Sequence, residues 1–160
     1  MDLAQSQSVF VLPVRVYYED TDHGGVVYYA NYLKFMERSR TEYLRSCGLE
    51  QDRLINHEDL IFAVSRAEID YKRPATFNNL LLVTAEIAET SRVKMTFKQQ
   101  IYRTEHKFAE MSGFFQNSET VLEHGTLLCD ARISIAALGA VNMRPKRIPQ
   151  TIFEELMREH

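Results

Sequence analysis

The spacing of apolar residues changes once from every second position to a helical interval and back, and this change constrains the fold most. From about Val27 to Cys47, apolar residues recur every three or four positions, and Gly48 then stands where helices commonly end. This stretch predicts one helix of about 20 residues. Alternation of apolar and polar residues predicts strands at residues 9–18, 61–71, 81–87, 93–101 and 129–135.

One long helix beside about five antiparallel strands is an α+β arrangement, because the helix is the only long element that can cover the apolar face of the sheet. A chain of 160 residues can bury a core, and we expect residues 1–160 to form a single domain. The sequence pattern of residues 149–160 predicts a C-terminal helix. Residues 104–125 are compatible with a short helix, a long hairpin or a lid, and contain the large apolar residues Phe108, Met111, Phe114 and Phe115.

Composition excludes several classes of protein. The formal net charge of −3 at pH 7 does not provide the basic surface that nucleic-acid binding requires. The chain has no run of about 18 apolar residues that would predict a membrane span. The first residues lack the pattern of a secretory signal, so we expect a cytoplasmic protein. Cys47 and Cys129 lack the spacing of a zinc site or a disulfide framework, and we expect them to be reduced packing residues.

The stretch EDTDHGGVVYY joins the first predicted strand to the helix and carries the candidate chemistry. In the simplest interpretation, an aspartate caps the helix or the turn, which is a common use of Asp beside Gly. A calcium loop starting at Asp20 fails, because its fifth and twelfth positions would be Gly24 and Asn31. A zinc site is disfavoured because no distant ligand accompanies the loop, so we expect no metal.

A third interpretation is catalysis at the start of the helix. Gly24 and Gly25 allow a ligand to approach the backbone, and first-turn N–H groups near Val27 to Tyr29 would be unpaired. The helix dipole adds about half a positive charge there. Such donors stabilise the oxyanion of an acyl-transfer reaction, and a carboxylate just upstream could attack the carbonyl or activate water.

These residues carry a resemblance to a known family. The segment YYEDTDHGGVVYYANYLKFMERSRTEYLR resembles the signature of the 4-hydroxybenzoyl-CoA thioesterase family, in particular of the acyl-CoA thioesterases associated with the Tol–Pal system. The resemblance continues through EIDYKRPA and into MRPKRIP, but residues 104–125 are longer than the turn that most members have there. It implies a hotdog fold, in which a curved antiparallel sheet wraps around one long central helix.

The resemblance also implies an activity and an assembly. The substrate would be a thioester of coenzyme A or of acyl carrier protein, and no bound cofactor would be needed, because coenzyme A arrives with the substrate. The subunits would form a homodimer through sheet edges, often paired again into a tetramer, with active sites at the interface. In the family's pattern, the catalytic aspartate falls on Asp22, and the backbone N–H that polarises the carbonyl falls on Tyr29.

The remaining site residues follow from the same resemblance. Gly24 and Gly25 match small residues of the family's loop, and Arg92 and Lys94 match the region where members contact the nucleotide of coenzyme A. Asp22 would act as a nucleophile or as a general base, and both routes remain open.

Other roles in the loop and other functions were weighed against this one. Asp20 is expected to organise the loop together with Asn31, and His23 to be a spectator. A hotdog dimer that only holds acyl-CoA or acyl carrier protein would be a scaffold associated with lipid metabolism and the cell envelope, but the intact Asp22 argues against this alternative. A hotdog dehydratase would need a histidine paired with an acid across the dimer, and the chain lacks that pattern.

Overall fold

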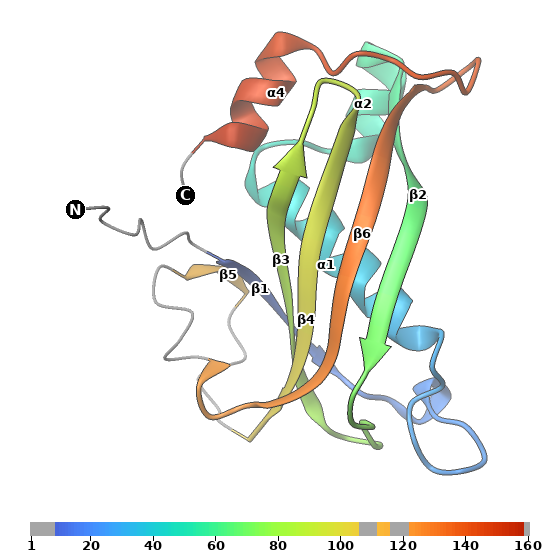
Figure 1. Cartoon of the computed structure of the whole chain (residues 1–160), viewed down its shortest axis with the longest axis vertical. Coiled ribbons are helices and arrows are strands. Elements are labelled where there is room, and N and C mark those ends of the chain that lie inside the picture. Colours follow the sequence, from blue (N-terminus) through green and yellow to red (C-terminus); the bar gives the residue numbers. More distant parts are fainter. Residues whose placement is uncertain (1–8, 106–111, 116–121, 159–160) are drawn as a thin grey trace.

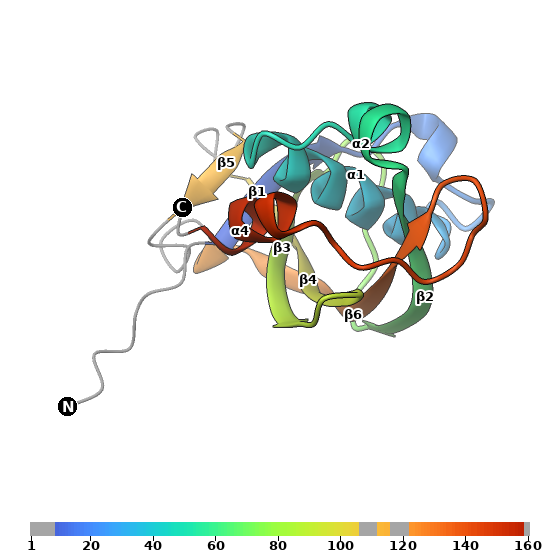
Figure 2. The ribbon, with the colours of Figure 1, turned by 90° about the horizontal axis from the view of Figure 1, so that it is seen from above.

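The computed structural model of the chain describes residues 9–105, 112–115 and 122–158. A helix or strand contains most of these residues (Figure 1), in the order β1 (Val9–Arg15), the short 3₁₀ helix η1 (Tyr18–Asp20), α1 (Asn31–Ser46), α2 (Gln51–Glu58), β2 (Leu60–Tyr71), β3 (Leu80–Thr90), β4 (Lys94–Thr104), β5 (Gly113–Phe115), β6 (Thr126–Gly139) and α4 (Gln150–Met157). Seen from above, the sheet curves around α1 (Figure 2).

The described strands form one six-stranded sheet in the order β2-β6-β4-β3-β1-β5, and every pair is antiparallel. The sequence predicted about five strands. The additional strand is β5, which lies within residues 104–125 and pairs with β1, where Phe114 stands opposite Phe10. A curved antiparallel sheet around one long helix confirms the predicted α+β hotdog fold.

Helix α1 begins at Asn31 rather than near Val27, and it has 16 residues rather than about 20. The backbone before Asn31 is not helical: Asn31 N–H bonds to Tyr28 O, three residues back, at 2.8 Å, and the preceding residues are bonded to other segments. Val27 N–H donates to Ala75 O at 2.9 Å, and Tyr28 N–H donates to Asp20 O at 2.8 Å. The helix therefore starts only after the chain has been attached to the loop after β2 and to η1.

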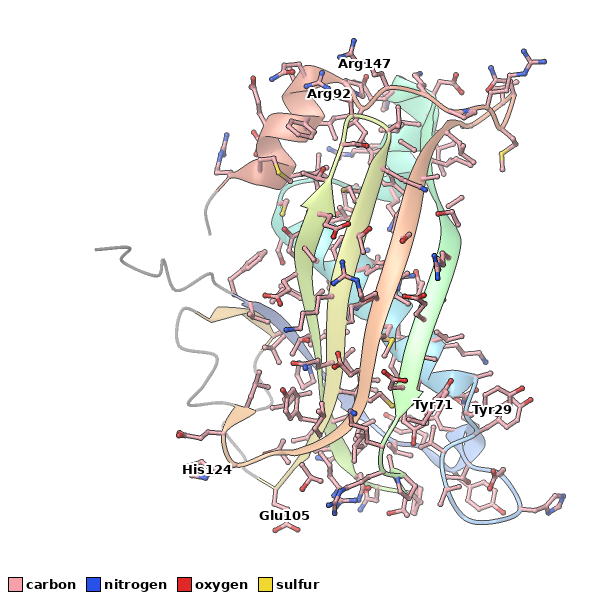
Figure 3. The ribbon with its side chains drawn as sticks, in the orientation of Figure 1. Tyr29, Tyr71, Arg92, Glu105, His124 and Arg147 are labelled. Atoms are coloured by element: carbon pink, nitrogen blue, oxygen red, sulfur yellow. The ribbon has the colours of Figure 1, made fainter. Side chains whose placement is uncertain are left out.

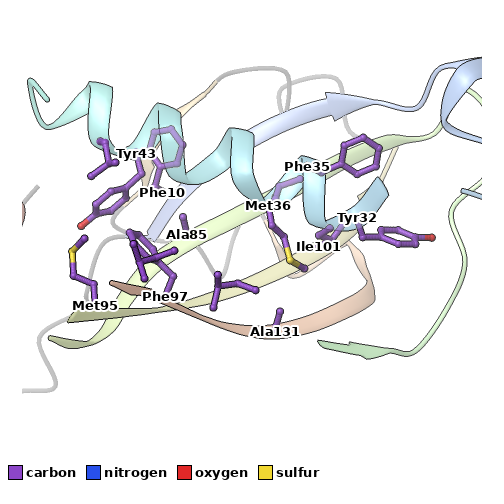
Figure 4. Close-up of a cluster of buried hydrophobic side chains, with 14 of the residues drawn as sticks. Phe10, Tyr32, Phe35, Met36, Tyr43, Ala85, Met95, Phe97, Ile101 and Ala131 are labelled. Atoms are coloured by element: carbon purple, nitrogen blue, oxygen red, sulfur yellow. The ribbon is translucent and has the colours of Figure 1, made fainter. Parts of the chain in front are cut away.

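The core lies between α1 and the inner face of the sheet, and Figure 4 shows part of it. Phe35, Met36 and Tyr43 of α1 are buried there, whereas Tyr29 and Leu33, which the helical spacing also assigned to the apolar face, are 62% and 37% exposed. The alternation predicted for three strands is confirmed by the burial of Leu81, Val83, Ala85, Met95, Phe97, Ile101, Cys129, Ala131, Ile133 and Ile135.

In strand β2, the alternation of side chains between the core and the outer face changes phase between the two halves of the strand. The alternation in the sequence predicts that Ile61 and Ala63 face inward, but Leu60 is fully buried instead. A bulge between residues 64 and 66 then shifts the register against β6, and Ile69 packs against the core as predicted. The strand forms one edge of the sheet, so its outer side has no strand neighbour among the described residues.

Residues 104–125 are described only in part. Phe108 and Met111 lie outside the described residues, and only the backbone of Phe115 is described. The predicted C-terminal helix at 149–160 corresponds to α4, and residues 159–160 again lie outside the described part.

The described part of residues 104–125 packs on both faces of the sheet near β1. On the inner face, the ring of Phe114 lies 5.2 Å from the ring of Phe10 and 5.3 Å from that of Tyr43. On the outer face, a second apolar cluster contains the fully buried Leu82 with Leu122 packed against it. β5 and its neighbours thus cover the edge of the sheet opposite to β2.

Candidate active site

The loop between η1 and α1 forms a tight turn around Asp22. The backbone N–H of Asp22 donates to Val26 O at 2.9 Å, and its carbonyl accepts a hydrogen bond from Gly25 N–H at 3.0 Å. Its carboxylate Oδ1 accepts a hydrogen bond from Gly24 N–H at 2.8 Å. The side chain is exposed, and no donor in the described part of the chain contacts Oδ2, which leaves this oxygen available for chemistry.

The two glycines shape this turn. Gly25 has a φ of +79°, in the left-handed region that favours glycine. A Cβ atom added at Gly24 would lie 3.2 Å from Oδ1 of Asp22, against the carboxylate that Gly24 N–H orients. Both glycines therefore hold Asp22 in place, and their contact with a substrate stays a prediction.

Asp20 connects the turn to the start of α1. The side chain is buried, and its Oδ2 accepts a hydrogen bond from Tyr17 N–H at 2.8 Å. Its Oδ1 accepts a hydrogen bond from Asn31 Nδ2 at 3.1 Å, and its backbone carbonyl accepts one from Tyr28 N–H. These contacts agree with the predicted role of Asp20 and Asn31 in organising the loop.

The backbone N–H of Tyr29 is a free donor at the start of the helix. Among the described residues, none accepts a hydrogen bond from it. Tyr29 precedes the N-cap residue Ala30, so its N–H lies before the first turn of α1. The sequence predicts this N–H within the first turn, and that detail is wrong. The donor nevertheless lies within two residues of Asn31, where the positive end of the helix dipole acts.

Tyr71 contacts the candidate site, although no pattern in the sequence predicts it there. This side chain extends from the last residue of β2, and its hydroxyl donates to Tyr29 O at 3.0 Å. Figure 3 shows Tyr29 and Tyr71 at the same end of the molecule. The only sequence signal was a tyrosine at the end of a strand within EIDYKRPA, a signal that identifies no partner.

Tyr32 connects the helix to the segment after β2. Its hydroxyl accepts a hydrogen bond from Ala75 N–H at 3.0 Å. Burial raises the pKa of Tyr32 above its usual value, and the negative charge of Asp22 adds a smaller rise. Tyr32 therefore fixes the first turn of α1 against the segment after β2.

Arg92 and Lys94 lie far from this loop within one protomer. Figure 3 shows Arg92 at the opposite end of the molecule from Tyr29. The Arg92 guanidinium stacks over the ring of Phe153, 4.9 Å from its centroid, and Nη1 donates to Gln150 Oε1, so Arg92 holds α4. Lys94 is exposed at the start of β4.

A cavity of about 120 Å³ lies between α1, the start of α2 and strands β2, β4 and β6. Its apolar wall includes Leu44 and Phe97, and its polar wall includes Glu37 and Arg40. Burial lowers the pKa of Arg40, and its Nη1 donates to the fully buried Gln99 at 2.9 Å. The cavity is therefore mainly apolar with one cation in its wall.

Other chemistry has little support in the described residues. No three His, Cys, Asp or Glu side chains gather there closely enough to hold a metal ion. None of the helices in this part of the chain is long and apolar enough to cross a membrane. Cys47 and Cys129 are buried, and burial raises their pKa to about 11 and about 12, so both thiols are protonated at neutral pH.

The fold and the loop define a class of protein, the hotdog thioesterases. In this class a curved sheet surrounds one long helix, and an acidic loop precedes that helix. The sequence profile of the Thioesterase superfamily, 4HBT, matches residues 24–109, and the chain belongs to this family. The match begins after Asp22, so the role of that residue rests on the geometry of the loop and on the resemblance of its sequence.

Two relatives align over almost their whole lengths. The acyl-CoA thioesterase YbgC of Haemophilus influenzae is 36% identical over 143 residues, which cover 89% of this chain and 90% of that protein. The acyl-CoA thioester hydrolase YbgC of Escherichia coli O157:H7 is 34% identical over 148 residues, which cover 92% and 96%.

Solved structures share the fold. A probable thioesterase from Bartonella henselae superposes with a TM-score of 0.72 at 31% identity, over 88% of this chain and 99% of that one. A 4-hydroxybenzoyl CoA thioesterase complexed with 4-hydroxybenzoyl CoA superposes with a TM-score of 0.76 at 15% identity, over 92% and 98%. The second likeness shows the fold alone.

Proposed function

We propose that this chain hydrolyses acyl-CoA thioesters to a free acid and coenzyme A, with Asp22 as the reacting carboxylate and Tyr29 N–H as the oxyanion donor. One observation carries the proposal: an exposed carboxylate and an unpaired backbone N–H belong to the same loop, which is attached to the start of α1. The family membership and the names of the two relatives support the same reaction.

In the nucleophilic route, Oδ2 of Asp22 attacks the thioester carbon, and the carbonyl oxygen becomes an oxyanion that accepts the Tyr29 N–H bond. The C–S bond then breaks, coenzyme A leaves as a thiolate that takes a proton from water, and a mixed anhydride remains. Water hydrolyses the anhydride and restores Asp22. In the general-base route, Asp22 takes a proton from water, the resulting hydroxide attacks, and the proton passes to the departing sulfur.

Backbone donors of this kind contribute about 10²- to 10³-fold to the rate of acyl transfer. In both routes the substrate supplies coenzyme A, so we propose no bound cofactor and no metal. The acyl group would extend along α1 towards the cavity near Leu44. A cytoplasmic location remains a prediction from the sequence. A carrier-protein thioester as an alternative substrate and a role with the Tol–Pal system in lipid metabolism remain predictions from the resemblance.

Acyl-CoA substrates of graded chain length, with an aromatic acyl-CoA beside them, test the function directly. We expect release of free thiol from at least one of them, measured with a thiol reagent. Binding of all these substrates without release of coenzyme A from any of them would favour the scaffold alternative.

We infer a homodimer that forms through β2. This strand has 12 residues at the edge of the sheet, and its side chains include Val64 and Tyr71, which are 53% and 45% exposed. Long unpaired edges are sites of strand pairing between copies of a chain. Sedimentation should give a mass of about twice the 18.6 kDa chain, or four times that mass if dimers pair again. A monomeric mass would contradict the proposal.

Such a dimer would give Arg92 and Lys94 a role in a neighbouring site. When two β2 strands pair antiparallel about a two-fold axis, the partner subunit runs in the opposite direction to this protomer. The end of the partner that carries its Lys94 then lies near the end of this protomer that carries Asp22. We therefore expect Lys94→Ala to raise KM for acyl-CoA by about 5-fold with kcat unchanged, because one phosphate contact is lost. Arg92→Ala should also lower Tm, since it loses the contacts to Phe153 and Gln150.

The matched control for Lys94→Ala is the corresponding acyl-pantetheine substrate, which carries no nucleotide. Its KM should be the same for the wild type and for Lys94→Ala. An unchanged KM for acyl-CoA, or an equal rise for both substrates, would remove Lys94 from the nucleotide site.

A further inference from the structure

The carbonyl of Tyr29 lies one residue before the N-cap of α1 and is bonded to a side chain. If α1 began one residue earlier, the N–H of Leu33 would donate to this carbonyl, four residues back. Here Leu33 N–H donates to Ala30 O at 3.2 Å instead. Tyr29 O accepts its hydrogen bond from the hydroxyl of Tyr71 at 3.0 Å. A side chain at the end of β2 thus occupies the carbonyl that a helix starting one residue earlier would use.

The adjoining peptide group is also held in a fixed direction. Tyr28 O accepts a hydrogen bond from Asn31 N–H at 2.8 Å, so the Tyr28 carbonyl points towards the helix. Because the peptide unit is planar and trans, the Tyr29 N–H of the same unit points the opposite way, away from the helix. The two peptide groups that meet at Tyr29 are therefore both fixed through their carbonyl oxygens.

We propose that Tyr71 is a positioning residue for the oxyanion donor: its hydroxyl holds the Tyr29 carbonyl outside α1 and so keeps the Tyr29 N–H turned towards the thioester. This inference rests on the proposed function and names a residue that acts on the same site. Without the hydroxyl, the Tyr29 carbonyl becomes available to Leu33 N–H, and the Tyr29 backbone can rotate into the helix.

The surroundings of Tyr71 suit this role. Its ring meets the ring of Tyr29 edge-on at 6.3 Å and lies 5.7 Å from the ring of the buried Tyr32. These contacts limit the movement of the ring and thereby aim the hydroxyl. Burial raises the pKa of Tyr71 above its usual value of 10.0, so the hydroxyl remains a protonated donor throughout the neutral range.

Tyr71→Phe tests the proposal, since it removes the hydroxyl and keeps the ring. We expect kcat to fall by roughly 3- to 10-fold, with KM for acyl-CoA and Tm nearly unchanged, because a single net hydrogen bond is lost. The matched control is Tyr102→Phe, which removes a hydroxyl bonded to Gln100 Oε1 at 2.9 Å on β4 and should leave kcat unchanged. A kcat within 2-fold of the wild type in Tyr71→Phe, or an equal loss in Tyr102→Phe, would overturn the proposal.

A second readout does not depend on turnover. The carbonyl stretching frequency of an aromatic acyl-CoA bound to Asp22→Asn reports the strength of the oxyanion donor. Adding Tyr71→Phe should shift this frequency back towards its value in water, and an unchanged frequency would contradict a positioning role. If the wild type binds acyl-CoA without hydrolysing it, the proposed function fails while the frequency still decides the role of Tyr71. If no acyl-CoA binds, both proposals fail.

Discussion

Asp22→Asn should lower kcat for acyl-CoA hydrolysis by roughly 10³-fold or more, because an amide can neither attack the thioester nor take a proton from water. The fold should be unaffected. The side chain is exposed, and the amide oxygen of asparagine can accept the Gly24 N–H bond that Oδ1 of Asp22 accepts. Steady-state kinetics and a thermal melt measure the two expectations.

Glu19→Gln is the matched control for this variant. It makes the same carboxylate-to-amide change at an exposed residue of η1, three positions before Asp22. We expect its kcat to stay within about 2-fold of the wild type, because surface charges contribute little by themselves. Near-wild-type turnover by Asp22→Asn, or an equal loss in Glu19→Gln, would remove Asp22 from the reaction.

The two chemical routes differ in where a water oxygen appears. In a single turnover in ¹⁸O-water, hydrolysis of a mixed anhydride by attack at the aspartyl carbon would leave the label in Asp22, whereas the general-base route leaves Asp22 unlabelled. Mass spectrometry of the peptide that contains Asp22 reads the difference. Both routes assign the reaction to Asp22, so this experiment separates the routes and does not test the assignment.

Asn31→Asp should lower kcat by about 10- to 100-fold, because it places a second carboxylate against the buried Asp20 and displaces the loop that carries Asp22. In the wild type, Asn31 Nδ2 donates to Asp20 Oδ1 at 3.1 Å, and the variant replaces this donor with a second acceptor. The free energy of unfolding should fall by about 1–3 kcal/mol. A carboxylate at the first position of a helix is otherwise favourable, so helix propensity would not explain the loss.

Adding Asp20→Asn to this variant should restore activity. The new asparagine can accept the Tyr17 N–H bond with its oxygen and donate to the new carboxylate at position 31, which reverses the direction of the original hydrogen bond. We expect the double variant to recover most of the lost kcat and stability, measured as a double-mutant cycle. Two independent losses that simply add would show that the contact between these side chains does not hold the loop.

Most of the fold could be predicted from local patterns. The inward rows of β3, β4 and β6 follow from simple alternation, because each of these strands pairs on both sides within the sheet and turns one row of apolar side chains towards the core. Strand β2 was assigned the wrong phase in its first half, since LIFAV is apolar at almost every position and alternation cannot orient it. The bulge that reverses the phase is a property of its pairing with β6.

The candidate site was predicted less completely. The carboxylate, the glycines and the helix start are adjacent in the sequence, so the loop could be recognised as a unit. Tyr71 could not be recognised in this way, because about 40 residues separate it from Tyr29 and only the fold brings its hydroxyl to the Tyr29 carbonyl. The position of Arg92 at the opposite end of the molecule from Tyr29 is likewise a result of the topology (Figure 3).

The sequence by itself determined the elements that depend on local periodicity: one helix, a set of half-buried strands, and an acidic turn in which Gly25 accepts a positive φ. The tertiary structure decided where that helix begins. Val27 N–H and Tyr28 N–H bond to Ala75 O and Asp20 O, and Tyr29, which precedes the N-cap, has an N–H with no acceptor among the described residues. A backbone N–H bonds to whichever acceptor the fold places beside it. Here the acceptors are Asp20 O in η1 and Ala75 O in the loop after β2, and a local sequence pattern cannot predict either contact.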